Sequence, residues 1–279
     1  MMQVNWRRRK EDFTGGLPLL AGPFNRNPQG LCYLEWLPIV LAMGLVWRRR
    51  WWRFFIGSLN RPLIFLTIFA WNMEQQKAQA AQSFLGFLVP GLVVMAAVSG
   101  SYVDLVNWFT LRRNYYRVLD EYLLAPISTA SLLAGHVLGA GAKGFISALV
   151  VFSCAGTFFV EGFCFPLFFF LQLLVICLTF ACLAVAVAMV AGGDKDTLMF
   201  TNLIVFPMTF FCGTFFPVEQ LPGLLARLCW GLPLTAATYN LRALALSGAF
   251  HPDWFFQSIG WMAGLYLLAY WLLKWRREE

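Results

Sequence analysis

Long runs of apolar residues, separated by short polar segments, set the pattern of this chain. A helix that crosses a bilayer needs about 20 mainly apolar residues. Five stretches reach that length clearly, at residues 84–106, 131–159, 165–191, 198–216 and 254–273. A weaker stretch, "RPLIFLTIFAWNM", covers residues 61–73 and could extend to residue 80. The pattern therefore predicts an all-α polytopic membrane protein with six transmembrane helices.

Clusters of arginine and lysine lie between these runs and indicate their orientation. They fall at Arg7–Lys10, Arg48–Arg53, Arg112–Arg117 and Lys274–Arg277. Six spans place all of these clusters on one side of the membrane, and loops rich in Lys and Arg stay in the cytoplasm. Five spans would leave one basic end outside, so the charges support counting the weak first span. We therefore expect both termini in the cytoplasm.

The segment before the first span mixes tryptophan with arginine. Residues 1–33 are polar and rich in Gly and Pro, which predicts a cytoplasmic tail. Residues 34–60 contain "VWRRRWWRFF", and such a mixture favours the headgroup zone of an anionic leaflet. We expect an amphipathic helix lying on the inner membrane surface. The alternative is an additional span at residues 37–47, which is short and contains Pro38.

Composition excludes several other classes of protein. Hydrophobic residues make up 59% of the chain and charged residues 13%, against roughly 45–50% and about 25% in soluble proteins. The seven cysteines form no CxxC pair and the two histidines are far apart, so we expect no metal site. The basic clusters flank apolar runs, which argues against a nucleic-acid partner. No G-x-x-x-x-G-K-[ST] motif occurs, so we expect no ATP hydrolysis and no cofactor in this chain.

A polar loop, "TLRRNYYRVLDEYLLAPIS", separates the second and third spans at residues 110–128. As a helix, it would present Tyr115, Leu119, Tyr122 and Leu123 on one face. Another face would carry the charged residues Arg117, Asp120 and Glu121, and Pro126 would end the helix. The residues alone fit a solvated connector and a docking helix for a soluble partner equally well.

Prolines interrupt the apolar stretch "FFCGTFFPVEQLPGLLARLCWGLPLT" at residues 210–235. Pro217, Pro222 and Pro233 remove backbone donors, and broken helix is tolerated in lipid only where protein or water surrounds it. We expect two short helices over residues 218–246 that dip back from the outer face, with their turn at Gly231 and Pro233. Glu219, Arg227 and Arg242 would then lie near the outer headgroups. A surface loop without gating is the alternative.

Few ionisable residues lie inside the spans. "GAGAKG" at residues 139–144 fits a dinucleotide fingerprint but lies in a membrane helix, so we reject that reading. Gly135, Gly139 and Ala140 instead favour close helix packing. Lys143 shares a helix face with His136, and an intramembrane cation indicates a functional site unless it snorkels to the surface. An intramembrane enzyme would need paired acids or a His–acid cluster, and Asp104, the only strong candidate, stands alone.

Three blocks of sequence resemble the type-2 ABC-transporter permease family, closest to its nodulation-factor (lipo-oligosaccharide) and antibiotic exporters. They are "FLVPGLVVMAAVSGSY", "RVLDEYLLAPISTASLLAGHVLGAGAKG" and "PMTFFCGTFFPVEQLPGLL" followed by "LPLTAATYNLRAL". The resemblance spans residues 35–277. Two positions depart from the family: Cys212 stands where Ser is more common, and His136 where an acid often stands. The family often has a basic residue at the position of Lys143.

The resemblance implies a homodimer in the bacterial inner membrane that works with two copies of a separate ATPase, which binds the ATP and Mg. It also implies that residues 113–125 form a coupling helix seated in that ATPase. The coupling residues would be Arg117, Asp120, Glu121, Tyr122, Ala125 and Pro126. Residues 218–246 would be a hairpin at the outer mouth.

We therefore expect an exporter permease that moves a large amphipathic substrate, such as a lipid-linked saccharide or glycolipid, in contact with membrane lipid. Candidate residues for its path or gate are Lys143, Phe215, Phe216, Pro217, Glu219 and Pro222. Grouped phenylalanines at residues 168–170, 210–211 and 215–216 fit either lipid-facing packing or an aromatic path. The alternatives are a permease for hydrophobic drugs or antibiotics, an intramembrane enzyme, and a channel, which would need charged pore rings.

Overall fold

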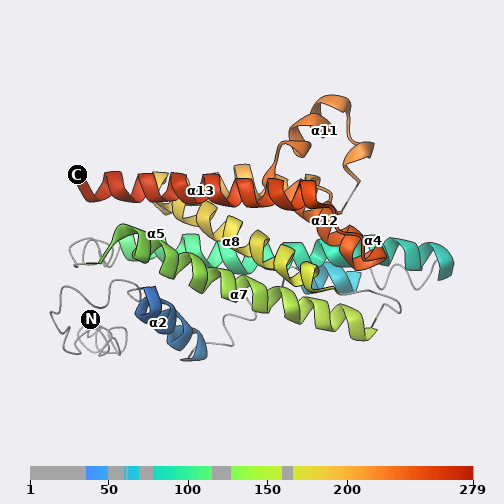
Figure 1. Cartoon of the computed structure of the whole chain (residues 1–279), viewed down its shortest axis with the longest axis horizontal. Helices are drawn as coiled ribbons and strands as arrows, with labels where there is room; N and C mark the ends of the chain where they lie inside the picture. Colours follow the sequence, from blue (N-terminus) through green and yellow to red (C-terminus); the bar gives the residue numbers. More distant parts are fainter. Residues whose placement is uncertain are drawn as a thin grey trace, which may run out of the picture.

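The computed structural model describes residues 36–49, 60, 62–68, 78–114, 127–158, 166–215 and 217–278. All regular structure within these residues is helical, and none of them lies in a strand. The prediction of an all-α membrane protein is confirmed. Figure 1 shows the long helices running side by side along the longest axis of the molecule.

Four helices are long and apolar enough to cross a membrane, by length and composition. One is a continuous helical path made of α4 (Ala78–Val98), the π turn η2 (Ser99–Val103) and α5 (Asp104–Asn114). The others are α7 (Thr129–Phe158), α8 (Leu167–Val190) and α13 (Pro252–Glu278). They correspond to the predicted second, third, fourth and sixth spans. Some continue past the predicted bounds because helical hydrogen bonding extends into polar flanking residues.

The predicted fifth span is helical, but a π turn interrupts its regular α-helical hydrogen bonding. It consists of α9 (Asp194–Phe200), the π turn η3 (Thr201–Val205) and α10 (Phe206–Phe211), which follow one another without a gap. At the usual rise per residue this path is roughly 27 Å long, close to the thickness of the hydrocarbon core. Of the weak first span, residues 62–68 are helical and much of the rest lies outside the described residues. The extension of this span as far as residue 80 is wrong, because α4 already begins at Ala78.

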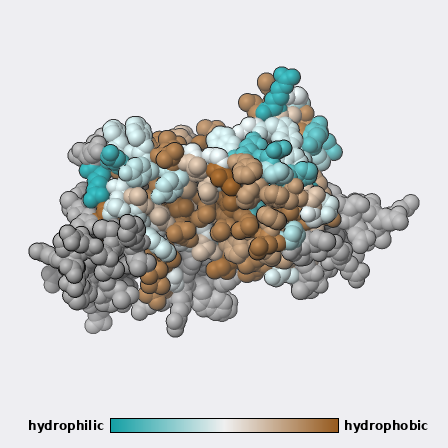
Figure 2. Space-filling view, in the orientation of Figure 1, coloured by the Kyte–Doolittle hydropathy of each residue, from teal (hydrophilic) through white to brown (hydrophobic). Residues whose placement is uncertain are grey.

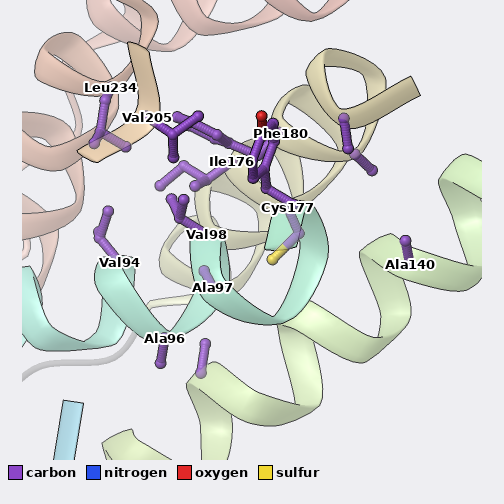
Figure 3. Close-up of a cluster of buried hydrophobic side chains, with 14 of the residues drawn as sticks. Val94, Ala96, Ala97, Val98, Ala140, Ile176, Cys177, Phe180, Val205 and Leu234 are labelled. Atoms are coloured by element: carbon purple, nitrogen blue, oxygen red, sulfur yellow. The ribbon is translucent and has the colours of Figure 1, made fainter. Parts of the chain in front are cut away.

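The second and fourth spans form the core of the bundle. Of their most apolar windows, 83% and 72% respectively are buried inside the protein, against 17% for α13, which therefore lies at the periphery. Small and branched side chains of α4 and α8 meet in the buried cluster drawn in Figure 3. Figure 2 shows hydrophobic residues over the middle of one face, with hydrophilic residues toward its two ends.

Arginines tie the helices together at the end of the bundle that holds the C terminus, here called the C-terminal end (Figure 1). Arg113 of α5 donates to the carbonyl groups of Ala188, Met189 and Ala191 at 2.8, 3.3 and 2.7 Å. These carbonyls belong to the last turn of α8 and to the residue that follows it, where a cation also complements the helix dipole. Arg277 of α13 donates to the carbonyl of Ile127 at 3.0 Å, just before α7.

Helix α2 (Trp36–Arg49) falls within the segment predicted to be an interfacial helix and packs against α7. A Cβ at Gly135 would lie 2.9 Å from Cβ of Ile39, and one at Gly139 would lie 2.7 Å from the sulfur of Met43. Both distances are too short for a side chain, so these glycines allow the close approach that their small size predicted. The predicted position of this helix at the membrane surface stays a prediction.

Candidate functional site

Lys143 of α7 and Asp104 of α5 form an ion pair inside the bundle. The side chain of Lys143 is 9% exposed and that of Asp104 is 35% exposed. Asp104, the lone acid singled out in the sequence, therefore has a basic partner that the sequence interpretation did not assign to it. The signal for this pair was present, because an acid and a base within apolar spans each need a partner. It was missed because the two residues lie on different spans.

His136 lies in an aromatic setting on the same helix as Lys143. Its Nδ1 donates to the carbonyl oxygen of Leu132 at 2.8 Å, one turn earlier along α7. Its ring contacts those of Trp108 and Phe109 on α5, with centroids 4.8 Å apart in both cases. His136 therefore contributes to packing between α5 and α7.

Residues 218–247 form two short helices, as the prolines predicted, at the opposite end of the bundle, here called the hairpin end (Figure 1). After a 3-10 turn, η4 (Val218–Gln220), come α11 (Gly223–Trp230) and α12 (Pro233–Ser247). Pro222 immediately precedes α11 and Pro233 is the first residue of α12, positions where a missing N–H is harmless.

The two hairpin helices have different surroundings. Helix α12 is largely buried against the bundle, and its residues Leu234, Leu241 and Leu244 have no exposed surface. Helix α11 stands away from the bundle in Figure 1, and its Leu224 and Leu228 are 75% and 61% exposed. The predicted hairpin is therefore one fixed helix and one helix that presents an apolar face.

Two side chains of α12 hold the segment that leaves the fifth span. The hydroxyl of Tyr239 donates to the carboxylate of Glu219 and accepts from the backbone N–H of Val218, both at 2.8 Å. Arg242 donates to the carbonyl of Gly213 at 2.6 Å. Glu219, a predicted gate residue two positions after Pro217, is therefore bonded to α12 through Tyr239.

Arg242, predicted to lie near the outer headgroups with Glu219 and Arg227, is buried among the helices, and its depth in the membrane stays a prediction. Besides Gly213, it donates through Nε and Nη2 to the carbonyl of Phe87 in α4, at 3.3 and 3.1 Å. Its guanidinium carbon lies 3.5 Å from the centre of the Phe87 ring. Carbonyl dipoles and an aromatic face stabilise the cation there. Glu219 and Arg227 are exposed.

Phe215, another predicted path residue, is buried in an aromatic cluster. Its ring stacks on Phe210 at 5.1 Å between centroids and contacts Phe65, from the first predicted span, also at 5.1 Å. The cluster joins the first and fifth spans. The phenylalanine groups are mixed elsewhere, since Phe169 is buried and Phe168 is 45% exposed. Phe216 lies outside the described residues.

A buried amide network joins three helices at the hairpin end and was missed in the sequence. Asn240 of α12 donates to Gln172 of α8, and Gln172 donates to Ser258 of α13, both at 3.1 Å. The backbone N–H of His251 donates to the side-chain oxygen of Asn240 at 3.2 Å. The available signal was a single glutamine in an otherwise apolar span, because an amide side chain inside a membrane protein needs a hydrogen-bond partner.

The predicted coupling residues, from Arg117 to Pro126, all lie outside the described residues. The structure does describe what flanks them. On one side is Arg113, bonded to the end of α8, and on the other is Ile127, bonded to Arg277. Both ends of the predicted coupling segment are therefore attached to long helices of the bundle.

These features define a multi-pass α-helical membrane protein with a helical hairpin at one end and buried polar contacts between spans. Residues 40–246 match the ABC-2 type transporter family, and the chain belongs to that family. This confirms the resemblance read from the sequence and makes the protein a transmembrane transport permease.

Curated relatives are similar over most of the chain. Nodulation protein J of Rhizobium meliloti is 23% identical over 213 residues, which cover 76% of this chain and 81% of the relative. Nodulation protein J of Neorhizobium galegae is 24% identical over 227 residues, covering 81% and 86%. The inner membrane transport permease YadH of Escherichia coli K12 is 24% identical over 201 residues, covering 69% and 76%.

Proposed function

We propose that this chain is the membrane subunit of a bacterial ABC exporter that carries a large amphipathic substrate out of the cytoplasm or the inner leaflet. Two copies form the path and two separate ATPase subunits drive it. The substrate class is a lipid-linked saccharide or a glycolipid. The observation that carries the proposal is the family match over residues 40–246, which includes both the predicted coupling segment and the hairpin.

The contacts at the two ends of the bundle support this division of labour. At the C-terminal end, the predicted coupling segment is attached through Arg113 to α8 and through Arg277 to α13. Movement of a docked ATPase would thereby reach two long helices. At the hairpin end, the amide network joins α8 and α13 to α12. The same helices therefore contact both the driven end and the exit.

The path residues proposed for the substrate combine charge with aromatic surface. Asp104 is partly exposed beside Lys143, and so offers an acid and a base to the polar part of a substrate. Pro217 and Pro222 bracket the exposed Glu219 at the mouth, and the aromatic cluster around Phe215 lines the first and fifth spans. A hydrophobic drug or antibiotic would use the aromatic surface alone, which makes drug efflux the second candidate.

Reconstituted transport tests the proposal. The permease would be co-expressed with a candidate ABC ATPase from the same organism, purified as a complex and placed in vesicles. A fluorescent lipo-oligosaccharide and a hydrophobic dye would be offered separately. ATP-dependent movement of the saccharide alone supports the proposal, and movement of the dye alone assigns drug efflux. A permease that does not co-purify with the ATPase contradicts both.

A further inference from the structure

Two spans of this protein carry a π turn, and the two turns touch. Within the described residues these are η2 (Ser99–Val103) in the second span and η3 (Thr201–Val205) in the fifth. The hydroxyl of Tyr102 lies 3.2 Å from the hydroxyl of Thr201, within hydrogen-bonding distance. Tyr102 is fully buried, so this contact lies inside the bundle. A π turn interrupts regular helical bonding and is a common place for a helix to bend.

Between these turns and the C-terminal end of the bundle, the same two spans are in contact again. The hydroxyls of Thr110 in α5 and Thr197 in α9 lie 3.1 Å apart in a buried contact. Arg113, one turn further along α5, is bonded to the end of α8. The parts of the second and fifth spans between the π turns and the C-terminal end, here called the lower halves, are therefore attached to each other.

On the hairpin side, the two spans meet a third time. A Cβ at Gly91 of α4 would lie 2.2 Å from the carbonyl oxygen of Thr214, so backbone touches backbone there. Arg242 bonds the carbonyls of Phe87 and Gly213, which belong to these same two segments. The parts of both spans between the π turns and the hairpin end, here called the upper halves, are thus held together with α12.

Helix α7 supports the second span at the level of its π turn. A Cβ at Gly144 would lie 2.7 Å from the carbonyl oxygen of Ala97, and one at Gly100 would lie 2.9 Å from Cα of Gly144. The Asp104–Lys143 ion pair follows directly, at the first residue after η2. Close backbone contact on one side and an ion pair beside it make α7 a fixed support for bending.

We propose that the two π turns form one hinge, at which the second and fifth spans bend together against α7. The lower halves, α5 and α9, move as one body. The upper halves move as a second body with α12, and the Tyr102–Thr201 contact keeps the two bends in register. This inference rests on the proposed function, since bending at the hinge would carry movement from the ATPase end to the exit.

Distance measurements on the permease–ATPase complex test the hinge. Spin labels at exposed positions would form three pairs: Asn107–Lys195 within the lower half, Lys195–Ala130 between the lower half and α7, and Gln220–Ser153 between the upper half and α7. Labelled protomers would be diluted with unlabelled ones to suppress distances between copies. On binding ATP, the Asn107–Lys195 distance should stay constant. The two distances to α7 should change by amounts that differ by several ångströms.

The outcomes separate the hinge from the proposed function. If both distances to α7 shift by the same amount and in the same sense, the spans move as rigid rods and the hinge is overturned. A change in the Asn107–Lys195 distance of similar size overturns it too. Loss of ATPase co-purification instead contradicts the proposed function, and the hinge as a transport device falls with it.

A substitution tests the contact that joins the two bends. Tyr102→Phe removes only the hydroxyl and keeps the ring in the core. We expect it to lower export at least fivefold while ATPase co-purification and ATP hydrolysis persist, so that more ATP is used per substrate moved. The matched control is Tyr266→Phe, which alters a long, exposed contact of 3.5 Å on α13. Equal transport per ATP in the wild type and Tyr102→Phe would show that the contact does not couple the bends.

Discussion

Lys143 and Asp104 pair across two transmembrane helices, α7 and α5, although 39 positions separate them in the chain. The side chain of Lys143 is almost fully buried, while that of Asp104 is about a third exposed. A buried charge is costly without a partner, so each residue makes the presence of the other tolerable.

Removing one member of this pair should cost more than replacing both. Asp104→Asn leaves the buried ammonium without its counter-charge, and after discounting for the partial exposure of Asp104 we expect a loss of about 1–3 kcal/mol. The double variant Asp104→Asn with Lys143→Met should recover part of it. Thermal unfolding midpoints of the purified protein in detergent measure both, with the exposed Lys195→Met as control. A double variant less stable than Asp104→Asn would contradict the prediction.

Gly91 should tolerate no side chain. An added Cβ would meet the carbonyl oxygen of Thr214 at 2.2 Å, and the neighbouring backbone is held by Arg242, so relief requires separating α4 from the fifth span. We expect Gly91→Ala to reduce the yield of folded protein sharply.

Gly264→Ala on α13 provides the matched control, because nothing lies within 4 Å of the added atom. Alanine in a helix is favoured over glycine by roughly 0.5–1 kcal/mol, so this variant should be as stable as the wild type or slightly more so. Size-exclusion profiles in detergent compare the two. Equal yields of monodisperse protein would show that the contact can relax.

The spans and the hairpin could be predicted from the sequence because both follow from local rules. Apolar length gives the spans, and prolines give the short helices α11 and α12. The class of all-α polytopic membrane protein could be predicted for the same reason. A long polar side chain such as Arg242 is different, because its position depends on which backbone carbonyls other segments bring near it.

Contacts between spans could not be predicted for the same physical reason. The Lys143 pair, the Gln172 network and the Tyr102–Thr201 contact each depend on the rotation of two helices about their axes. An apolar helix in lipid shows little amphipathic pattern, so its sequence says little about which face meets which neighbour. The π turns add a further rotation that no helical periodicity announces.

Membrane orientation gives a prediction that rests on the basic clusters. Single cysteines at Gln76 and Gln220, in a variant without the native cysteines, should react with an impermeant thiol reagent in intact cells. A cysteine at Asn114 should react only after the cells are opened, because the positive-inside rule keeps its arginine-rich surroundings in the cytoplasm. Labelling at Asn114 from outside would refute the six-span arrangement.

The predicted coupling segment should respond to reversal of its charged face. Asp120→Lys together with Glu121→Lys should weaken co-purification of the ATPase and lower ATP-driven export. One exposed ion pair contributes only about 0–1 kcal/mol, which is why the double change is needed. The control is the double reversal Asp194→Lys with Asp196→Lys, on exposed acids of α9. Intact docking and export in the first variant would show that these residues do not contact the ATPase.

Cross-linking tests whether the hairpin moves. Helix α11 exposes Leu224 and Leu228, whereas α12 is held by Arg242 and Tyr239, so we expect any opening to involve α11. A single cysteine at Leu224, in the variant without native cysteines, should form a disulfide between the hairpins of two copies if these face each other. Oxidised protein should bind ATP but export little, and reduction should restore export.

The position of the cross-link is what makes this result informative. A cysteine at Leu267 is equally suited to oxidation, because that side chain is 65% exposed, but it lies on α13 away from the hairpin. A block at both positions would reflect a general effect of oxidation. Export at the full rate with Leu224 cross-linked would mean that α11 is a static lid or a packing element. The exit would then lie laterally between the first and fifth spans, where Phe65 contacts Phe210 and Phe215.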